Sequence, residues 1–283
     1  MIVMKRREFL MSSAAVAAAR GMWGQSPDAA KMSRIGVMSL CFESSILKDP
    51  AHPDDPKRTL DLMDFPDAMA ERLGVHNVEI QHEHFFSTEP AYFQQFLARV
   101  KKAKSRVSQI NLEFGPLNVS AKDPIRRLET IDLSKRWIDH AVMLGCPRVM
   151  VNQGTLEPAL RPAAIEALKS IHTYAKTKKV FITFEVRGKE WEAQLDVIKA
   201  SGILPHADSA GFRGDEEARV KALRLMYPNT SGNSHVTTGS NIADSVKIAK
   251  ELGYKGLYTI EGRHRGDPYE EVKANIDIVL ANM

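Results

Sequence analysis

Short apolar runs alternate with longer amphipathic segments from residue 33 to residue 280 of this 283-residue chain. The short runs lack a helical period and are predicted strands, whereas the longer segments carry apolar residues at helical spacing. Eight strands are expected, at Ser33–Phe42, Asn77–Gln81, Val107–Phe114, Arg148–Asn152, Val180–Glu185, Ile203–Asp208, Thr230–His235 and Gly256–Glu261. Eight helices follow them in turn, at Thr59–Leu73, Pro90–Lys104, Asp123–Leu144, Pro162–Thr177, Glu190–Ala200, Asp215–Met226, Ser240–Leu252 and Asp267–Leu280.

The strict alternation of these elements indicates the class of fold. Alternating strands and helices form parallel sheets with crossover helices, and eight such units within about 250 residues fit one closed barrel. An open doubly wound sheet is the alternative, but it favours a glycine-rich first turn, and none follows Phe42. We therefore predict an α/β fold, a single (β/α)8 TIM barrel, over residues 31–283.

The residues before the predicted barrel have the pattern of an export signal. Lys5-Arg6-Arg7 precedes Phe9-Leu10 and a short run rich in Ala and Ser, from Met11 to Ala19. This arrangement resembles a twin-arginine signal peptide. We expect residues 1–30 to be that signal, removed or disordered, and the mature protein to be periplasmic or otherwise extracytoplasmic. The run is too short to serve as a permanent membrane anchor.

The charge of the remaining chain argues against a nucleic-acid partner. Four of the 39 basic residues and one of the 35 acidic residues lie in residues 1–25, which leaves 35 and 34. A nearly neutral body lacks the basic surface of a nucleic-acid-binding protein. Cys41 and Cys146 belong to separate strand regions, so we expect two buried free thiols rather than the disulfide that export would permit.

Polar side chains stand at most of the predicted strand ends, where TIM barrels build their active sites. They are Gln81, His82 and His84 after the second strand, Glu113 at the third, Asn152 and Gln153 at the fourth, and Glu185, Asp208, His235 and Glu261 at the fifth to eighth. The last four strands thus end in carboxylate, carboxylate, imidazole and carboxylate. Three oxygen donors and one nitrogen donor suit a divalent ion such as Mn²⁺, Mg²⁺ or Zn²⁺. We predict Glu185, Asp208, His235 and Glu261 as the ligands of one such ion.

Several stretches of the chain carry a family likeness. They are Phe65–Gly74 with Val78–Ile80, Phe181–Glu185, Leu204–Asp208, Tyr227–His235 and Gly256–Glu261 with Asp267-Pro268 behind it. These stretches resemble the xylose isomerase-like TIM barrels, specifically the sugar phosphate isomerase/epimerase group related to ketose 3-epimerases. The resemblance runs from about Ile35 to Leu280. It implies a metal-dependent carbohydrate isomerase or epimerase, with Mn²⁺ as the first choice of ion.

The resemblance also implies a role for two of the carboxylates. Glu185 and Glu261 would be both metal ligands and acid/base groups, one removing a proton next to a sugar carbonyl and the other returning it on the opposite face. In the family the Glu at the position of Glu185 is often followed by Asn, whereas this chain has Val186-Arg187. The His at the position of His235 is often followed two residues later by Lys, whereas this chain has Thr237. These departures concern positions around the substrate, so they put the substrate in more doubt than the metal.

Further polar residues are predicted to contact the small-molecule carbohydrate. They are His82, His84, Asn152, Arg187, His206, Arg263 and His264. His82 and His84 are two residues apart and would share one face of an extended strand, as would His206 and Asp208. Glu79 is expected inside the barrel or paired with an arginine.

Export bears on the choice of substrate and reaction. A cell-envelope enzyme rarely meets phosphorylated sugars, so a free sugar, a keto-sugar or an oxidised glycoside is favoured. The same proton abstraction with a leaving group one carbon further on gives β-elimination, so a metal-dependent lyase that releases the aglycone of a keto-glycoside is the first alternative. A non-catalytic sugar-binding barrel is the second, and the four intact ligand positions argue against it. The oligomeric state stays open, a homo-oligomer included.

Overall fold

Eight parallel strands close into one barrel in the computed structural model, which describes residues 27–53, 55–151, 154–212, 214–264 and 266–283. Their order around the barrel is their order in the sequence, which confirms the predicted (β/α)8 TIM barrel. They are β1 (Ile35–Met38), β2 (Asn77–Gln81), β3 (Arg106–Asn111), β4 (Arg148–Met150), β5 (Phe181–Glu185), β6 (Leu204–Asp208), β7 (Asn233–Thr237) and β8 (Leu257–Glu261). Pairing of β1 with β8, which sets Val37 opposite Ile260, closes the ring.

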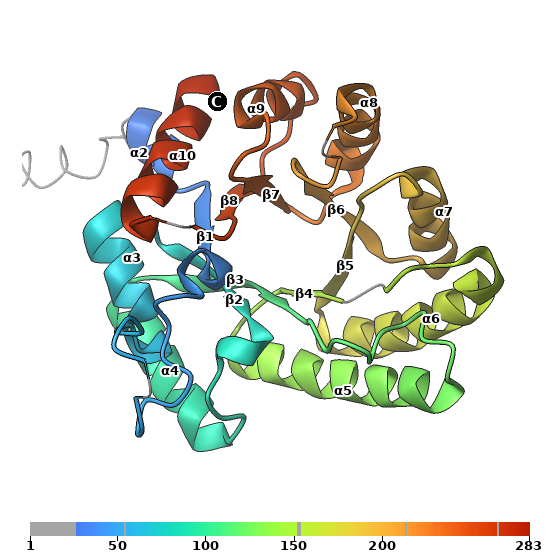
Figure 1. Ribbon diagram of the computed structural model, residues 1–283, viewed down its shortest axis with the longest axis horizontal. Helices are drawn as coiled ribbons and strands as arrows, with labels where there is room; N and C mark the ends of the chain where they lie inside the picture. The colour runs from blue at the N-terminus through green and yellow to red at the C-terminus, as the bar shows by residue number, and fades with distance from the viewer. Residues whose placement is uncertain (1–26, 54, 152–153, 213, 265) are drawn as a thin grey trace, which may run out of the picture.

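A helix follows each strand and packs on the outside of the barrel (Figure 1). These helices are α3 (Phe65–Leu73), α4 (Pro90–Lys102), α5 (Pro124–Met143), α6 (Arg161–Lys178), α7 (Trp191–Ser201), α8 (Glu216–Met226), α9 (Ile242–Glu251) and α10 (Pro268–Asn282). One more helix, α2 (Pro27–Met32), precedes the barrel and lies beside α10. It overlaps the end of the predicted signal segment, whose residues 1–26 lie outside the described part of the chain.

The first and third strands are shorter than the sequence predicted. Ser33–Phe42 was expected to be one strand, but β1 ends at Met38 and Ser39–Phe42 turns into a 3₁₀ helix. The Ser39 hydroxyl accepts a hydrogen bond from the backbone N–H of Gln81 in β2. Likewise β3 ends at Asn111, so Glu113 lies in the loop beyond the strand.

The seventh strand is shifted along the chain relative to the predicted Thr230–His235. Tyr227–Asn229 forms a 3₁₀ turn, and Gly232 has a φ of 87°, a conformation that suits glycine and delays the start of the strand. As a result β7 continues past His235 to Thr237, which lies opposite Glu261 in β8. His235 therefore lies one layer deeper in the barrel than the strand ends.

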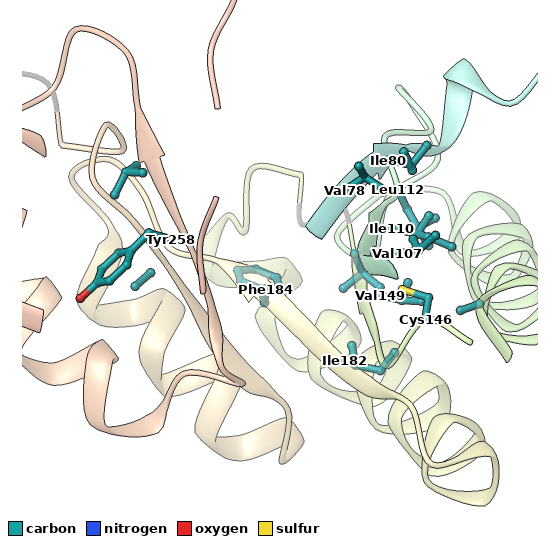
Figure 2. Close-up of a cluster of buried hydrophobic side chains, with 14 of the residues drawn as sticks. Val78, Ile80, Val107, Ile110, Leu112, Cys146, Val149, Ile182, Phe184 and Tyr258 are labelled. Atoms are coloured by element: carbon teal, nitrogen blue, oxygen red, sulfur yellow. The ribbon is translucent and has the colours of Figure 1, made fainter. Parts of the chain in front are cut away.

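The two faces of the strands differ sharply in polarity because side chains alternate along a strand. Apolar residues such as Ile110, Val149 and Ile182 face the helices and form the buried core, part of which is shown in Figure 2. The barrel interior is polar instead of being filled with branched apolar side chains. Its fully buried members are Glu79, Gln109, Thr183, His206, Asn233, His235 and Thr259. Glu79 thus lies inside the barrel, the first of the two positions predicted for it.

The remaining global expectations concern thiols and membranes. Cys41 and Cys146 are both buried free thiols, as predicted. The Cys41 thiol donates a hydrogen bond to the backbone carbonyl of Ile260, and burial raises the pKa of this thiol far above its ordinary value. Within the described ranges, no helix has the length and apolar character needed to cross a membrane.

Candidate metal centre and active site

Three side chains from three strands converge at the carboxyl end of the barrel. His235 Nδ1 lies 3.1 Å from Glu261 Oε2 and 3.9 Å from Glu185 Oε1. One donor atom from each of the three residues lies within 4.8 Å of the others. Each residue comes from the interior face of its strand, β5, β7 or β8, so the parallel register of the barrel brings them together. The arrangement offers one nitrogen and two carboxylate oxygens to a single point.

Asp208, the fourth predicted ligand, stands next to this trio at the end of β6. Its Oδ1 accepts a hydrogen bond of 2.7 Å from the Thr237 hydroxyl, which also lies 3.1 Å from Glu261 Oε2. The same Oδ1 accepts the backbone N–H of Ala210 at 3.0 Å. Thr237 therefore ties the carboxylates of β6 and β8 together at the rim. In the sequence Thr237 was noted only as a departure from the family and this contact was not predicted, although Thr237 follows His235 at the strand period of two.

The electrostatics of the four side chains show an excess of negative charge. Burial, with added repulsion from Glu185 and Glu261, raises the pKa of Asp208 to about 7. Burial opposes a charge on His235 as well, but Glu261 and Glu79 outweigh it and lift the His235 pKa well above its usual value. In return, the His235 imidazolium overcomes the burial of Glu261 and holds the pKa of that carboxyl low. One imidazolium, even with the Arg187 guanidinium beside Glu185, does not balance three carboxylates, so a divalent cation fits this donor set.

A pocket of about 770 Å³ opens directly above these residues. Its walls include Glu185, Arg187, Asp208, Thr237, Glu261, Arg263 and His264. The volume is in the range of small-molecule sites. A ligand in this pocket would touch the carboxylates of the centre directly.

Arg187 reaches over the centre from the loop after β5. Its Nη1 lies 3.0 Å from Glu185 Oε2, and about half of its side chain is exposed. Gln194 in α7 holds the loop, since it accepts the backbone N–H of Arg187 at 3.0 Å and donates to its carbonyl at 2.6 Å. Arg187 is therefore a cation placed at the pocket by a fixed backbone.

The loop after β8 supplies the other two predicted contacts that line the pocket. Arg263 Nε lies 2.6 Å from Glu43 Oε2 of the loop after β1, which links the first and last strands across the rim. His264 is buried, and its Nδ1 lies 2.5 Å from Glu271 Oε2 of α10. The other nitrogen of His264, Nε2, has no hydrogen-bond partner in the described part of the chain.

The remaining predicted contacts are not in the pocket wall. His82 and His84 lie on a 3₁₀ turn after β2, where the predicted strand does not continue. His82 Nδ1 accepts the backbone N–H of Glu113, and His84 Nδ1 lies 2.8 Å from the Ser39 hydroxyl. Burial lowers the pKa of each imidazole to about 4.

His206 and Asn152 complete the set of predicted substrate contacts. His206 is fully buried beneath the pocket, with its ring centroid 4.1 Å from that of His235. It shares a strand face with Asp208, as predicted, but one layer below. Asn152 lies outside the described residues.

Comparison with known proteins agrees with this geometry at the level of the fold. The sequence profile of the family described as xylose isomerase-like TIM barrel matches residues 68–281. No curated protein matches the chain. The chain belongs to the xylose isomerase-like TIM barrel family.

Solved structures of sugar-converting proteins have the same fold. D-psicose 3-epimerase from Clostridium cellulolyticum H10, solved with D-tagatose, superimposes with a TM-score of 0.71 at 12% identity, over 88% of this chain and 99% of that one. D-allulose 3-epimerase from Methylomonas sp., solved with D-allulose, gives 0.69 at 15% identity over 88% and 97%. A sugar phosphate isomerase/epimerase from Parabacteroides distasonis ATCC 8503 gives 0.65 at 13% identity over 88% and 94%.

Proposed function

We propose that this member of the xylose isomerase-like family is a divalent-metal-dependent sugar isomerase or epimerase that moves a proton next to a carbonyl. The observation that carries the proposal is the convergence of His235 Nδ1 with Glu185 and Glu261 under an open pocket. Glu185, Asp208, His235 and Glu261 would hold the ion, with Mn²⁺ as the first choice and Mg²⁺ or Zn²⁺ as alternatives. An ion held by these residues would supply a Lewis acid for a substrate carbonyl, which would make the neighbouring C–H more acidic.

The protein's own groups would carry the proton. Glu185 and Glu261 enter the pocket from β5 and β8, so a sugar carbon held between them presents one face to each. One carboxylate accepts the proton, and the other returns a proton to the opposite face, which inverts the carbon. Because Asp208 is tied to Thr237 and to the backbone of Ala210, it is better placed as a ligand than as a base.

The rim residues would orient the substrate. Arg187 and Arg263 line the pocket as hydrogen-bond donors, and His264 offers its unpartnered Nε2. These groups suit the hydroxyl and carbonyl oxygens of a sugar. The structural neighbours solved with D-tagatose and D-allulose support a free ketose as the substrate class. The predicted twin-arginine signal supports the same choice, since an exported enzyme would meet free sugars, and we propose export on that basis.

The test combines metal content with proton exchange. The purified protein is expected to contain one equivalent of a divalent metal by inductively coupled plasma mass spectrometry. In D2O it should wash deuterium into a ketose at the carbon next to the carbonyl, detected by NMR. Glu261→Gln should lower the rate of exchange by about 10³-fold, whereas the surface control Glu192→Gln should retain it. Release of the aglycone from a keto-glycoside without epimerisation would favour the lyase over the isomerase, and sugar binding without exchange would favour the non-catalytic barrel.

A further inference from the structure

One more carboxylate, that of Glu79 in β2, lies below the metal centre, on the side away from the pocket. Its side chain is fully buried in the barrel interior. Glu79 Oε1 lies 2.6 Å from His235 Nε2, the ring nitrogen on the side away from the Glu185 and Glu261 carboxylates. A buried charge is costly unless hydrogen bonds satisfy it. The contacts around Glu79 therefore decide what it does.

Every polar group that meets Glu79 donates to it. Its Oε1 accepts the Asn111 amide at 2.5 Å and the Gln109 amide at 3.2 Å, and its Oε2 accepts the Asn233 amide at 2.6 Å. Three amide donors on two oxygens favour the ionised carboxylate, because a protonated one gives up an acceptor position. An ionised Glu79 then accepts the Nε2–H of His235 as a fourth donor.

Neighbouring groups agree with this orientation of the amides. Gln109 Nε2 also donates to Asn111 Oδ1 at 2.9 Å, so that oxygen lies away from Glu79. The Thr259 hydroxyl donates to Asn233 Oδ1 at 2.7 Å, and a flipped Asn233 would set its amide oxygen against the Glu79 carboxylate. The NH2 groups of both asparagines therefore point at Glu79. The interior of β2, β3, β7 and β8 thus forms a cradle for one permanent negative charge.

The cradle determines which nitrogen of His235 is available. The imidazolium must release one proton to bind an ion, and because Nε2–H donates to Glu79, the proton released is the one on Nδ1, which frees the Nδ1 lone pair. Nδ1 is the atom that lies 3.1 Å from Glu261 and 3.9 Å from Glu185. A carboxylate on the far side of a ligating histidine fixes its tautomer and ring orientation and makes it a stronger ligand.

We propose that Glu79 is a positioning residue of the metal centre, which holds His235 as the Nε2–H tautomer and directs Nδ1 at the ion. The inference rests on the proposed metal dependence and adds to it a residue outside the pocket. A carboxylate that only stabilised the barrel would predict a different result, because its loss would lower stability without changing metal affinity in the proteins that still fold.

The test uses the full chain loaded with Zn²⁺, which is diamagnetic. Long-range ¹H–¹⁵N NMR spectra, with His235 assigned by its loss in His235→Gln, report the tautomer in the unaltered protein. A protonated Nε2 and a coordinated Nδ1 are expected. The reverse tautomer would overturn the proposal without any Glu79 variant. Absence of Zn²⁺ binding by the unaltered protein would instead overturn the proposed function itself.

Two variants then test the contribution to affinity, measured by competition with a chromophoric chelator. Glu79→Gln removes the negative charge beside His235. Glu79→Gln combined with Asn233→Asp keeps one buried negative charge in the cradle but moves it from position 79, which contacts His235, to position 233. Zn²⁺ affinity is expected to fall about 10- to 100-fold in each. Ser108→Ala, at a similarly buried position whose hydroxyl bonds the backbone carbonyl of Val78 and none of the side chains around Glu79, is the matched control and should bind like the unaltered protein. A folded Glu79 variant with unchanged affinity would refute the role.

Discussion

Two buried carboxylate sites lie in successive layers of the barrel, and their charges are balanced in different ways. In the lower layer, Glu79 is surrounded by oriented donors, and these, together with His235, overcome the cost of burial and hold its pKa below the ordinary value. In the upper layer, Asp208, Glu185 and Glu261 crowd together, and burial plus mutual repulsion raise the pKa of Asp208 to about 7. His235 lies between the layers and contacts both.

The contrast separates what the fold completes from what it leaves to a ligand. The lower site is satisfied by the chain alone, so it behaves as part of the core. The upper site has more negative charge than its one imidazolium can balance, and it faces an open pocket. The stability of the metal-free protein is therefore expected to depend mainly on Glu79, and the proton transfer on the upper carboxylates, while Glu79 acts on the ion only through His235.

The largest effect is expected from the upper layer in catalysis. Glu261→Gln should lower the rate of solvent deuterium exchange into the substrate by about 10³-fold, because a general acid/base group and a ligand are lost together. The fold should persist, since Glu261 lies at the rim. Exchange measured by NMR, alongside circular dichroism, tests this. Equal exchange in Glu261→Gln and in Glu192→Gln would contradict the proposed chemistry.

The next effect belongs to the lower layer in stability. Glu79→Ala should lower the free energy of unfolding by about 3–5 kcal/mol, because it leaves His235, Asn111 and Asn233 unsatisfied inside the barrel. Urea unfolding of the metal-free protein measures the loss. Glu192→Ala, which breaks a surface ion pair with Lys221, should change it by less than about 1 kcal/mol. If both substitutions lower the free energy of unfolding by the same amount, Glu79 does not stabilise the barrel interior as described.

A change of the opposite sign is expected at Asp208. Asp208→Asn keeps the acceptor for Thr237 and Ala210 but removes one crowded charge, so the metal-free protein should gain on the order of 2 kcal/mol at pH 8. The raised pKa means that Asp208 stays protonated to a higher pH in the folded state than in the unfolded state. The penalty of Asp208 is therefore absent below about pH 4, grows as the pH rises through the interval up to about 7, and is complete above it.

Urea unfolding of both proteins from pH 4 to 8, without metal, checks the sign and the interval. The two stability curves should coincide at the acid end and separate as the pH rises. Saturating divalent metal should reverse the ranking, because the unaltered protein gains a ligand that Asp208→Asn binds poorly. A destabilised Asp208→Asn at pH 8 without metal would mean that the upper layer is already balanced.

The contrast between layers also explains how far the sequence could be interpreted. Buried parallel strands appear as short apolar runs between helices, so the barrel and the ends of its second, fifth, sixth and eighth strands were predictable. Glu185, Asp208, His235 and Glu261 were chosen from the predicted ends. The contact of Glu79 with His235 joins residues 156 positions apart and depends on closure of the ring. No local pattern indicates it.

Boundary errors had a local cause and a direct consequence for the site. The predicted seventh strand ended at His235, so the contact of Thr237 with the carboxylates was not foreseen, because the 3₁₀ turn and Gly232 ahead of the strand were not recognised. The predicted extension of the second strand placed His82 and His84 toward the substrate, whereas a 3₁₀ turn fixes them against Glu113 and Ser39. In both cases the alternation of side chains along the strand was predicted correctly, but the residue at which the strand ends was not.

The smallest effect is expected at Thr237, the side chain that joins two upper carboxylates. Thr237→Val keeps the shape but removes the hydroxyl that bonds Asp208 at 2.7 Å and lies 3.1 Å from Glu261. One net hydrogen bond is worth about 1 kcal/mol, so metal affinity should fall roughly fivefold. Thr237→Ser should restore it, because the hydroxyl returns. Isothermal titration calorimetry with Mn²⁺ distinguishes the variants. Equal affinity of all three proteins would show that the Thr237 hydroxyl does not help to position the metal ligands.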